Sequence, residues 1–151
     1  MKNHLVLFAF LFIIASCSEH KQTAAYKPGL GEFMSSIQMH HAKLWFAGVD
    51  DNWDLANFEL GEIKETVEDA QHFCSDRPEI KNLPMLLPML DSLNYSIQNK
   101  NAKSFKSSFT NLTSTCNNCH AATNHKFIVI KTPDSEPVSN QVFEIERKTQ
   151  N

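Results

Sequence analysis

Four segments of the chain carry inward-facing positions at alternating spacings of four and three residues. This spacing places a single seam along each of four helices. Helices of this length with short connections predict an all-α protein, an antiparallel four-helix bundle. The seam positions are Leu30, Met34, Ile37, His41, Leu44 and Gly48; Trp53, Ala56, Leu60, Ile63, Val67, Ala70 and Cys74; Leu83, Leu86, Leu90, Leu93 and Ile97; and Ala102, Phe105, Phe109, Leu112, Cys116 and Cys119.

The sequences between these segments contain helix stop and start signals. Residues 48–52, "GVDDN", offer a glycine stop followed by capping residues. Residues 75–82 are polar and contain a proline. Pro84 fits the first turn of a helix. Pro88 is expected to kink the third helix or to delay its regular part to about Met85 onward.

The helical pattern ends after His125. Residues 127–131, "FIVIK", are strand-like, and the following "TPDSEPVSN" is loop-like. Several apolar residues in this region indicate partial docking, so we expect residues 126–151 to form an extended C-terminal tail packed on a helical domain of residues 29–125. These apolar residues are Phe127, Ile128, Ile130, Val142 and Phe143.

Composition supports one helical domain and excludes some functions. The chain has 151 residues, of which 42% are hydrophobic, which suits a single domain with a sizeable core. It has only four glycines, and few Val and Ile residues outside two short segments, which favours helix over sheet. A formal charge of −3 gives no electrostatic footprint for nucleic acid. Because no catalytic carboxylate pair, nucleophile–base pair or phosphate-binding loop is recognisable, we do not expect an enzyme.

The N-terminus has the features of an export signal. Lys2 supplies positive charge, and the apolar run of residues 5–15 is too short for a permanent membrane span. The "IASC" of residues 14–17 resembles the lipobox of bacterial lipoproteins. The resemblance implies a signal peptide of residues 1–16, lipidation of Cys17 and a tether of residues 17–28. An ordinary signal peptide cut nearby is the alternative. We expect an anchor in the cell membrane or outer membrane that faces the periplasm.

The last helical segment ends in a C-x-x-C-H motif, residues 116–120. Two thiols one helical turn apart can bond both vinyl groups of a haem, and the histidine that follows can reach the iron. Export agrees with this interpretation, because c-type haem is attached outside the cytoplasm. The motif therefore predicts one covalently attached haem c.

Three other interpretations of this motif remain open. A redox dithiol usually lies at a helix start after a strand, whereas this pair lies late in a helical stretch. A zinc site could combine Cys116, Cys119 and His120 with His125, but the chain has no second paired knuckle. A disulfide between helical residues three apart has poor geometry. Cys74 is left over as an odd cysteine, and its seam position predicts a buried core residue.

A four-helix pattern with C-x-x-C-H in its last helix resembles the class II c-type cytochromes, the cytochrome c′-like group, over residues 29–125. The resemblance implies that Cys116 and Cys119 form the thioethers and that His120 is the proximal iron ligand. The chain departs from the family in its long tail. It also departs at Asn124, where the family often has a basic residue.

In that family, a residue of the first helix faces the open side of the iron. Met34 lies on the seam near the start of the first segment, which an antiparallel bundle brings near the end of the fourth. We therefore expect Met34 as sixth ligand. His41 is the alternative, about 10 Å further along the helix axis. The residues expected to line the haem pocket are Ile37, His41, Phe105, Phe109 and Leu112.

We thus expect a lipid-anchored monohaem c-type cytochrome that carries single electrons outside the cytoplasm. The alternative is a five-coordinate haem protein that binds or senses a small gas such as nitric oxide. The expected partners are redox proteins and the membrane, not nucleic acid, and a homodimer is left open. A run of acidic residues predicts a solvated face that could attract a basic redox partner. These residues are Glu59, Glu62, Glu65, Glu68 and Asp69.

Overall fold

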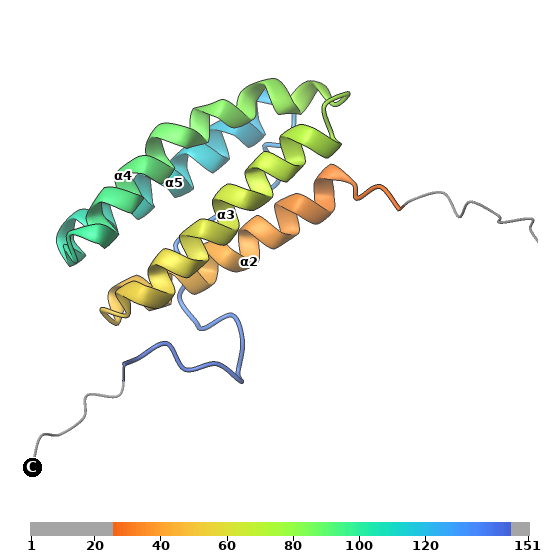
Figure 1. Cartoon of the computed structure of the whole chain (residues 1–151). Coiled ribbons are helices and arrows are strands. Elements are labelled where there is room, and N and C mark those ends of the chain that lie inside the picture. Colours follow the sequence, from red (N-terminus) through yellow and green to blue (C-terminus); the bar gives the residue numbers. More distant parts are fainter. Residues whose placement is uncertain (1–25, 146–151) are drawn as a thin grey trace, which may run out of the picture.

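The protein is described here by a computed structural model that covers residues 26–145. Within this range it is all-helical and contains no strand (Figure 1). The elements are α2 (Leu30–Val49), α3 (Trp53–Phe73), the 3-10 helix η2 (Pro78–Leu86), α4 (Leu87–Gln98) and α5 (Ala102–Ala122). The prediction of an all-α helical bundle is therefore confirmed.

Some predicted features fall outside residues 26–145. They are the signal peptide, Cys17, most of the tether and the last six residues of the predicted tail. Within the described range, no helix is both long enough and apolar enough to cross a membrane.

Side chains of the connecting sequences cap the helices. Asn52 accepts a hydrogen bond from the Leu55 amide at 3.2 Å at the start of α3. Asn101 does the same for the Ser104 amide at 2.9 Å at the start of α5. Such caps satisfy amides that have no partner within the helix. The sequence therefore specifies these helix starts locally.

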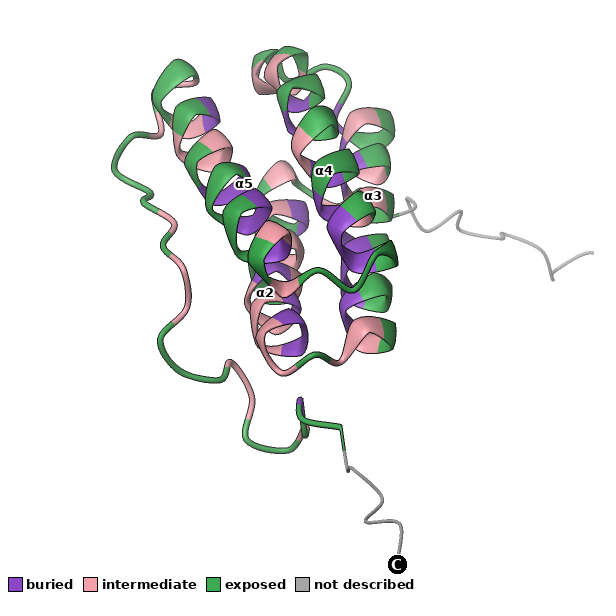
Figure 2. Ribbon diagram, turned by 90° about the vertical axis from the view of Figure 1, so that its left-hand side faces the viewer, coloured by how far each residue is buried: buried purple, intermediate pink, exposed green. Residues whose placement is uncertain are grey.

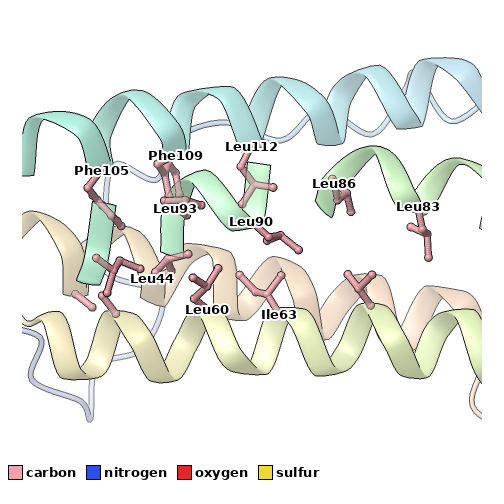
Figure 3. Packing of buried hydrophobic residues seen from close by; sticks show 14 of the residues in the cluster. Leu44, Leu60, Ile63, Leu83, Leu86, Leu90, Leu93, Phe105, Phe109 and Leu112 are labelled. Atoms are coloured by element: carbon pink, nitrogen blue, oxygen red, sulfur yellow. The ribbon is translucent and has the colours of Figure 1, made fainter. Parts of the chain in front are cut away.

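The seams of the four helices meet in one core (Figure 3). Figure 2 shows the buried residues on the inward-facing sides of the helices. Aromatic rings fill the end of the core that lies near the α2–α3 turn. The ring centroid of Phe105 lies 6.1 Å from that of Trp53 and 6.4 Å from that of Trp45. Gly48 permits this packing, because a Cβ there would lie 2.1 Å from the Phe105 ring. Cys74 is buried, as predicted.

The third predicted segment is divided into two elements. Residues 78–86 form η2, and the regular helix α4 begins at Leu87. Pro88 lies in the first turn of α4, where its missing N–H breaks no helical hydrogen bond, so it marks a helix start rather than a kink. Pro84 lies inside η2 and not in a first helical turn. The predicted delay of the regular helix is therefore confirmed, and α4 begins two residues after Met85.

The prediction that Glu59 lies on a solvated face is wrong. Its side chain is 1% exposed, and its Oε2 lies 2.7 Å from Nδ1 of His40. The reason is that α2 packs along this side of α3, so a carboxylate there requires a partner. Glu65 and Glu68 are exposed, as the acidic pattern indicates.

Residues 123–145, the C-terminal segment, follow α5 without regular secondary structure. The strand-like residues 127–131 form no strand, because they have no ladder partner in an all-helical protein. The side chain of Asn117 pairs with the backbone of Ile130 instead. Further along, Phe143 is 1% exposed and its ring lies 5.7 Å from Phe46. Phe127 and Val142 are exposed, so docking is confined to a few points (Figure 2).

Candidate functional site

A cavity of about 450 Å³ opens at the end of the bundle where the beginning of α2, η2, the end of α5 and the C-terminal segment meet. Its volume falls within the roughly 300–1,000 Å³ that is typical of cofactor sites. The lining residues are Leu30, Gly31, Met34, Ser35, Ile37, Gln38, Arg77, Glu79, Leu83, Leu86, Cys116, Cys119, His120, Thr123, His125, Ile128 and Ile130.

The C-x-x-C-H motif forms one wall of this cavity. Cys116, Cys119 and His120 lie on the last two turns of α5, and all three line the cavity. Both cysteines are free thiols. Burial raises the pKa of Cys116 to about 11 and raises that of Cys119, so both are protonated at neutral pH.

The imidazole of His120 is held by one backbone carbonyl. Its Nδ1 lies 2.9 Å from the carbonyl oxygen of Ile128. A carbonyl can only accept, so Nδ1 carries a proton, and in the neutral ring Nε2 then keeps its lone pair. Histidines that ligate metals almost always donate their other ring N–H in this way. His120 is therefore in the tautomer that can bind a metal through Nε2.

The turn after α5 brings the Ile128 carbonyl to this position. Asn124 has a φ of 63°, a left-handed conformation that asparagine tolerates better than most residues. The His125 amide donates to the His120 carbonyl at 2.7 Å, the pattern of a Schellman helix end. The Ile128 amide then donates to the His125 carbonyl at 2.8 Å. Asn124, noted above as a departure from the cytochrome family, is thus the residue that reverses the chain here.

The facing part of the lining comes from the first turns of α2. Met34 lies there with Leu30 and Ile37, and all three also pack against the core. Met34 is half-buried. Five of the residues predicted from the sequence are therefore brought to one cavity. They are Met34, Ile37, Cys116, Cys119 and His120.

His41 is not among the lining residues. It is 3% exposed, and its Nε2 lies 2.9 Å from Oγ1 of Thr113, which itself donates to the Phe109 carbonyl at 3.0 Å. Because the Thr113 proton is used in that bond, the Nε2 proton of His41 is donated to Thr113. Burial lowers the pKa of His41 to about 4. The structure thus makes His41 a neutral core residue, and its Nε2 is not available as an iron ligand.

Phe105, Phe109 and Leu112 also lie outside the lining. They are buried in the core at most 2% exposed, and the ring of Phe109 lies 4.9 Å from that of Trp45. The sequence places them on the seam of α5, but that seam faces the other helices until the last two turns. Their predicted role as pocket residues is not met in this cavity.

Sequence reasoning missed the contribution of the α3–α4 connection. Leu83 and Leu86 of η2 supply apolar lining, and Arg77 and Glu79 supply polar groups, paired with each other at 3.0 and 3.3 Å. Arg77 and Glu79 fall in the stretch of residues 75–82 that the sequence indicates as a polar break, whereas Leu83 and Leu86 are on the predicted seam of the third segment. The leucines at 83 and 86 were the available signal, since they continue the seam beyond the start of α4.

Among residues 26–145, no group of three or more His, Cys, Asp or Glu side chains is arranged to hold a metal ion. Cys116, Cys119, His120 and His125, the residues of the zinc interpretation, therefore do not form such a group. Comparisons of the chain with protein-family models, curated proteins and solved structures find no match.

Proposed function

We propose that this protein is a monohaem c-type cytochrome that carries single electrons outside the cytoplasm. The observation that carries the proposal is the tautomer of His120 at the cavity. The histidine of the C-x-x-C-H motif donates from Nδ1 to a backbone carbonyl, which leaves Nε2 for a metal. It lies in the wall of a cofactor-sized cavity that Met34 also lines. The same tautomer would also suit zinc, but residues 26–145 contain no group of three or more side chains arranged to hold such an ion.

The residues present fit a haem. Cys116 and Cys119 would form the thioethers, and His120 would be one axial ligand through Nε2. Met34 is the candidate for the second, because a thioether sulfur binds haem iron and stabilises its reduced state. Bound haem supplies an iron that cycles between two oxidation states. Leu83 and Leu86 are more than 90% buried and would help exclude water from the site.

The finer architecture and location belong to the same proposal. An antiparallel arrangement of the four helices, as in the class II cytochromes, would bring the start of α2 and the end of α5 together. The lipobox-like "IASC" would place a lipid on Cys17 and hold the protein at a membrane surface facing the periplasm. The expected partners are then redox proteins that reach the haem edge.

Haem attachment is tested by producing the full chain in a bacterium that matures c-type cytochromes. A haem stain on a denaturing gel, with the intact mass, should show one covalent haem. Cys116→Ser with Cys119→Ser should abolish the stain, whereas Cys74→Ser, in a buried cysteine outside the motif, should keep it. Wild-type chain without a haem adduct would refute the proposal.

The sixth ligand is tested with Met34→Ala and, as control, Met39→Ala in an exposed residue of the same helix. The reduced wild-type protein should be low-spin and should not bind carbon monoxide. Met34→Ala should become high-spin and bind it, while Met39→Ala should behave as wild type. Wild-type protein that already binds carbon monoxide would instead support the five-coordinate, gas-binding alternative.

A further inference from the structure

We propose that Asn117, the first variable residue of the C-x-x-C-H motif, is a positioning residue for His120. It clamps the C-terminal segment so that the Ile128 carbonyl keeps His120 in the tautomer that can ligate iron. This inference rests on the proposed function of His120 as an axial ligand, but the clamp itself can be measured without haem.

The clamp is a two-point hydrogen bond between a side chain and a backbone. Nδ2 of Asn117 donates to the carbonyl of Ile130 at 2.8 Å, and the Ile130 amide donates to Oδ1 of Asn117 at 2.8 Å. A carboxamide carries a donor and an acceptor side by side, so it pairs with a backbone residue as a neighbouring strand would. Few other side chains could satisfy both groups of Ile130 at once.

The spacing of the contacts links the clamp to His120. Asn117 and His120 are three residues apart on α5, so they lie on one face of the helix. Their partners on the C-terminal segment, Ile130 and Ile128, are two residues apart in non-helical chain. The segment therefore runs back along α5, and fixing Ile130 fixes the carbonyl two residues before it.

Burial of side chains does not hold this stretch in place. Phe127, Ile128 and Val129 are 77%, 42% and 73% exposed. Because these side chains bury little apolar area, the position of the Ile128 carbonyl depends on backbone hydrogen bonds. One anchor is the turn at Asn124, before it in the chain, and the other is the Asn117 clamp after it. Without the clamp, the next contact of the segment with the core after this carbonyl is at Val138, ten residues further on.

The position of this carbonyl bears on the electronic properties of the site. A hydrogen bond from Nδ1 to a carbonyl makes the imidazole a stronger electron donor through Nε2. A stronger donor favours oxidised iron and lowers the reduction potential. Loosening the Ile128 carbonyl should therefore raise the reduction potential, while leaving both thioether bonds in place.

The test compares the full-length Asn117→Leu variant with wild type and with Asn118→Leu, a matched control in the next, exposed residue of the same turn. NMR of the reduced proteins follows two signals, the hydrogen exchange of the Ile130 amide and that of the His120 Nδ1–H. The reduction potential of each protein is measured by spectroelectrochemical titration. Loss of two hydrogen bonds should accelerate Ile130 exchange by about 30-fold. The Nδ1–H signal should exchange faster, and the potential should rise.

The outcomes separate the clamp from the proposed function. If Asn117→Leu matches Asn118→Leu in exchange, the clamp does not exist. If exchange accelerates but the His120 signal and the potential stay at wild-type values, Asn117 only ties down the segment and its positioning role is wrong. If the wild-type chain carries no haem, the proposed function and the iron-positioning role both fall. Ile130 exchange and the His120 signal in the haem-free chain then decide whether the clamp exists and sets the tautomer.

Discussion

Burial of His41 should make the stability of the protein depend on pH in a way that can be assigned to this one side chain. His41 is 3% exposed, and burial lowers its pKa from 6.5 to about 4. Nδ1 of the neighbouring His40 lies 2.7 Å from Oε2 of Glu59, on a different partner from that of His41. The unfolded chain therefore binds a proton at position 41 over a pH range in which the folded chain does not.

The sign and size follow from linkage. A group whose pKa is lower in the folded state contributes its full stability above pH 6.5, and that contribution is lost as the pH falls toward 4. Between pH 7.5 and pH 5 the loss amounts to about 2 kcal/mol. This is a substantial fraction of the roughly 5–15 kcal/mol that stabilises a typical domain.

The assay is urea denaturation at a series of pH values for wild type, His41→Gln and His72→Gln. The glutamine at position 41 does not titrate and can still donate to Thr113, so its stability should lack the loss of about 2 kcal/mol between pH 7.5 and pH 5. His72 is exposed, and His72→Gln should keep the wild-type pH dependence. If wild type and His41→Gln lose stability in parallel, the assignment of the buried neutral imidazole is wrong.

Three further predictions concern packing. Gly48→Ala should lower the free energy of unfolding, measured by urea denaturation, by about 1–3 kcal/mol, because the added Cβ would overlap the Phe105 ring. Gly61→Ala should raise it by about 1 kcal/mol, because no atom lies within 4 Å of the added Cβ and alanine favours helix. Phe143→Ala should cost about 3 kcal/mol in the docking of the C-terminal segment, seen as faster proteolysis there; unchanged cleavage would contradict this. His40→Ala should cost about 3 kcal/mol by leaving the Glu59 carboxylate buried without its partner, and Glu59→Gln should cost less; equal effects on thermal unfolding would contradict this reasoning.

The helices could be predicted from the sequence because their signals are local. Seam residues such as Leu60 and Ile63 report burial through helical periodicity alone. Asn52 and Asn101 mark helix starts, because the capping bond is made within four residues of chain. The motif at residues 116–120 is equally local, so its place in the last turns of α5 was also predictable.

The features that sequence reasoning missed depend on contacts between distant parts of the chain. Glu59 belongs to a run of acidic residues, and only the neighbouring helix shows that it is buried against His40. His41 shares the seam with Met34, but which turn of α2 faces the cavity depends on where α5 ends and on η2. The use of Asn117 could not be foreseen, because an asparagine in a C-x-x-C-H motif carries no signal for a partner thirteen residues later.

The far anchor of the C-terminal segment has a consequence for the order in which the molecule folds. Asn52 donates to the carbonyl of Phe143 at 2.9 Å, a contact between residues 91 positions apart in the chain. Closing so long a loop costs conformational entropy before the contact can form, whereas each pair of neighbouring helices closes only a short loop. Refolding should therefore assemble the helices first and dock this segment afterwards. The stretch around Ile130 closes a loop of only thirteen residues on Asn117, so it can settle against α5 before Phe143 docks.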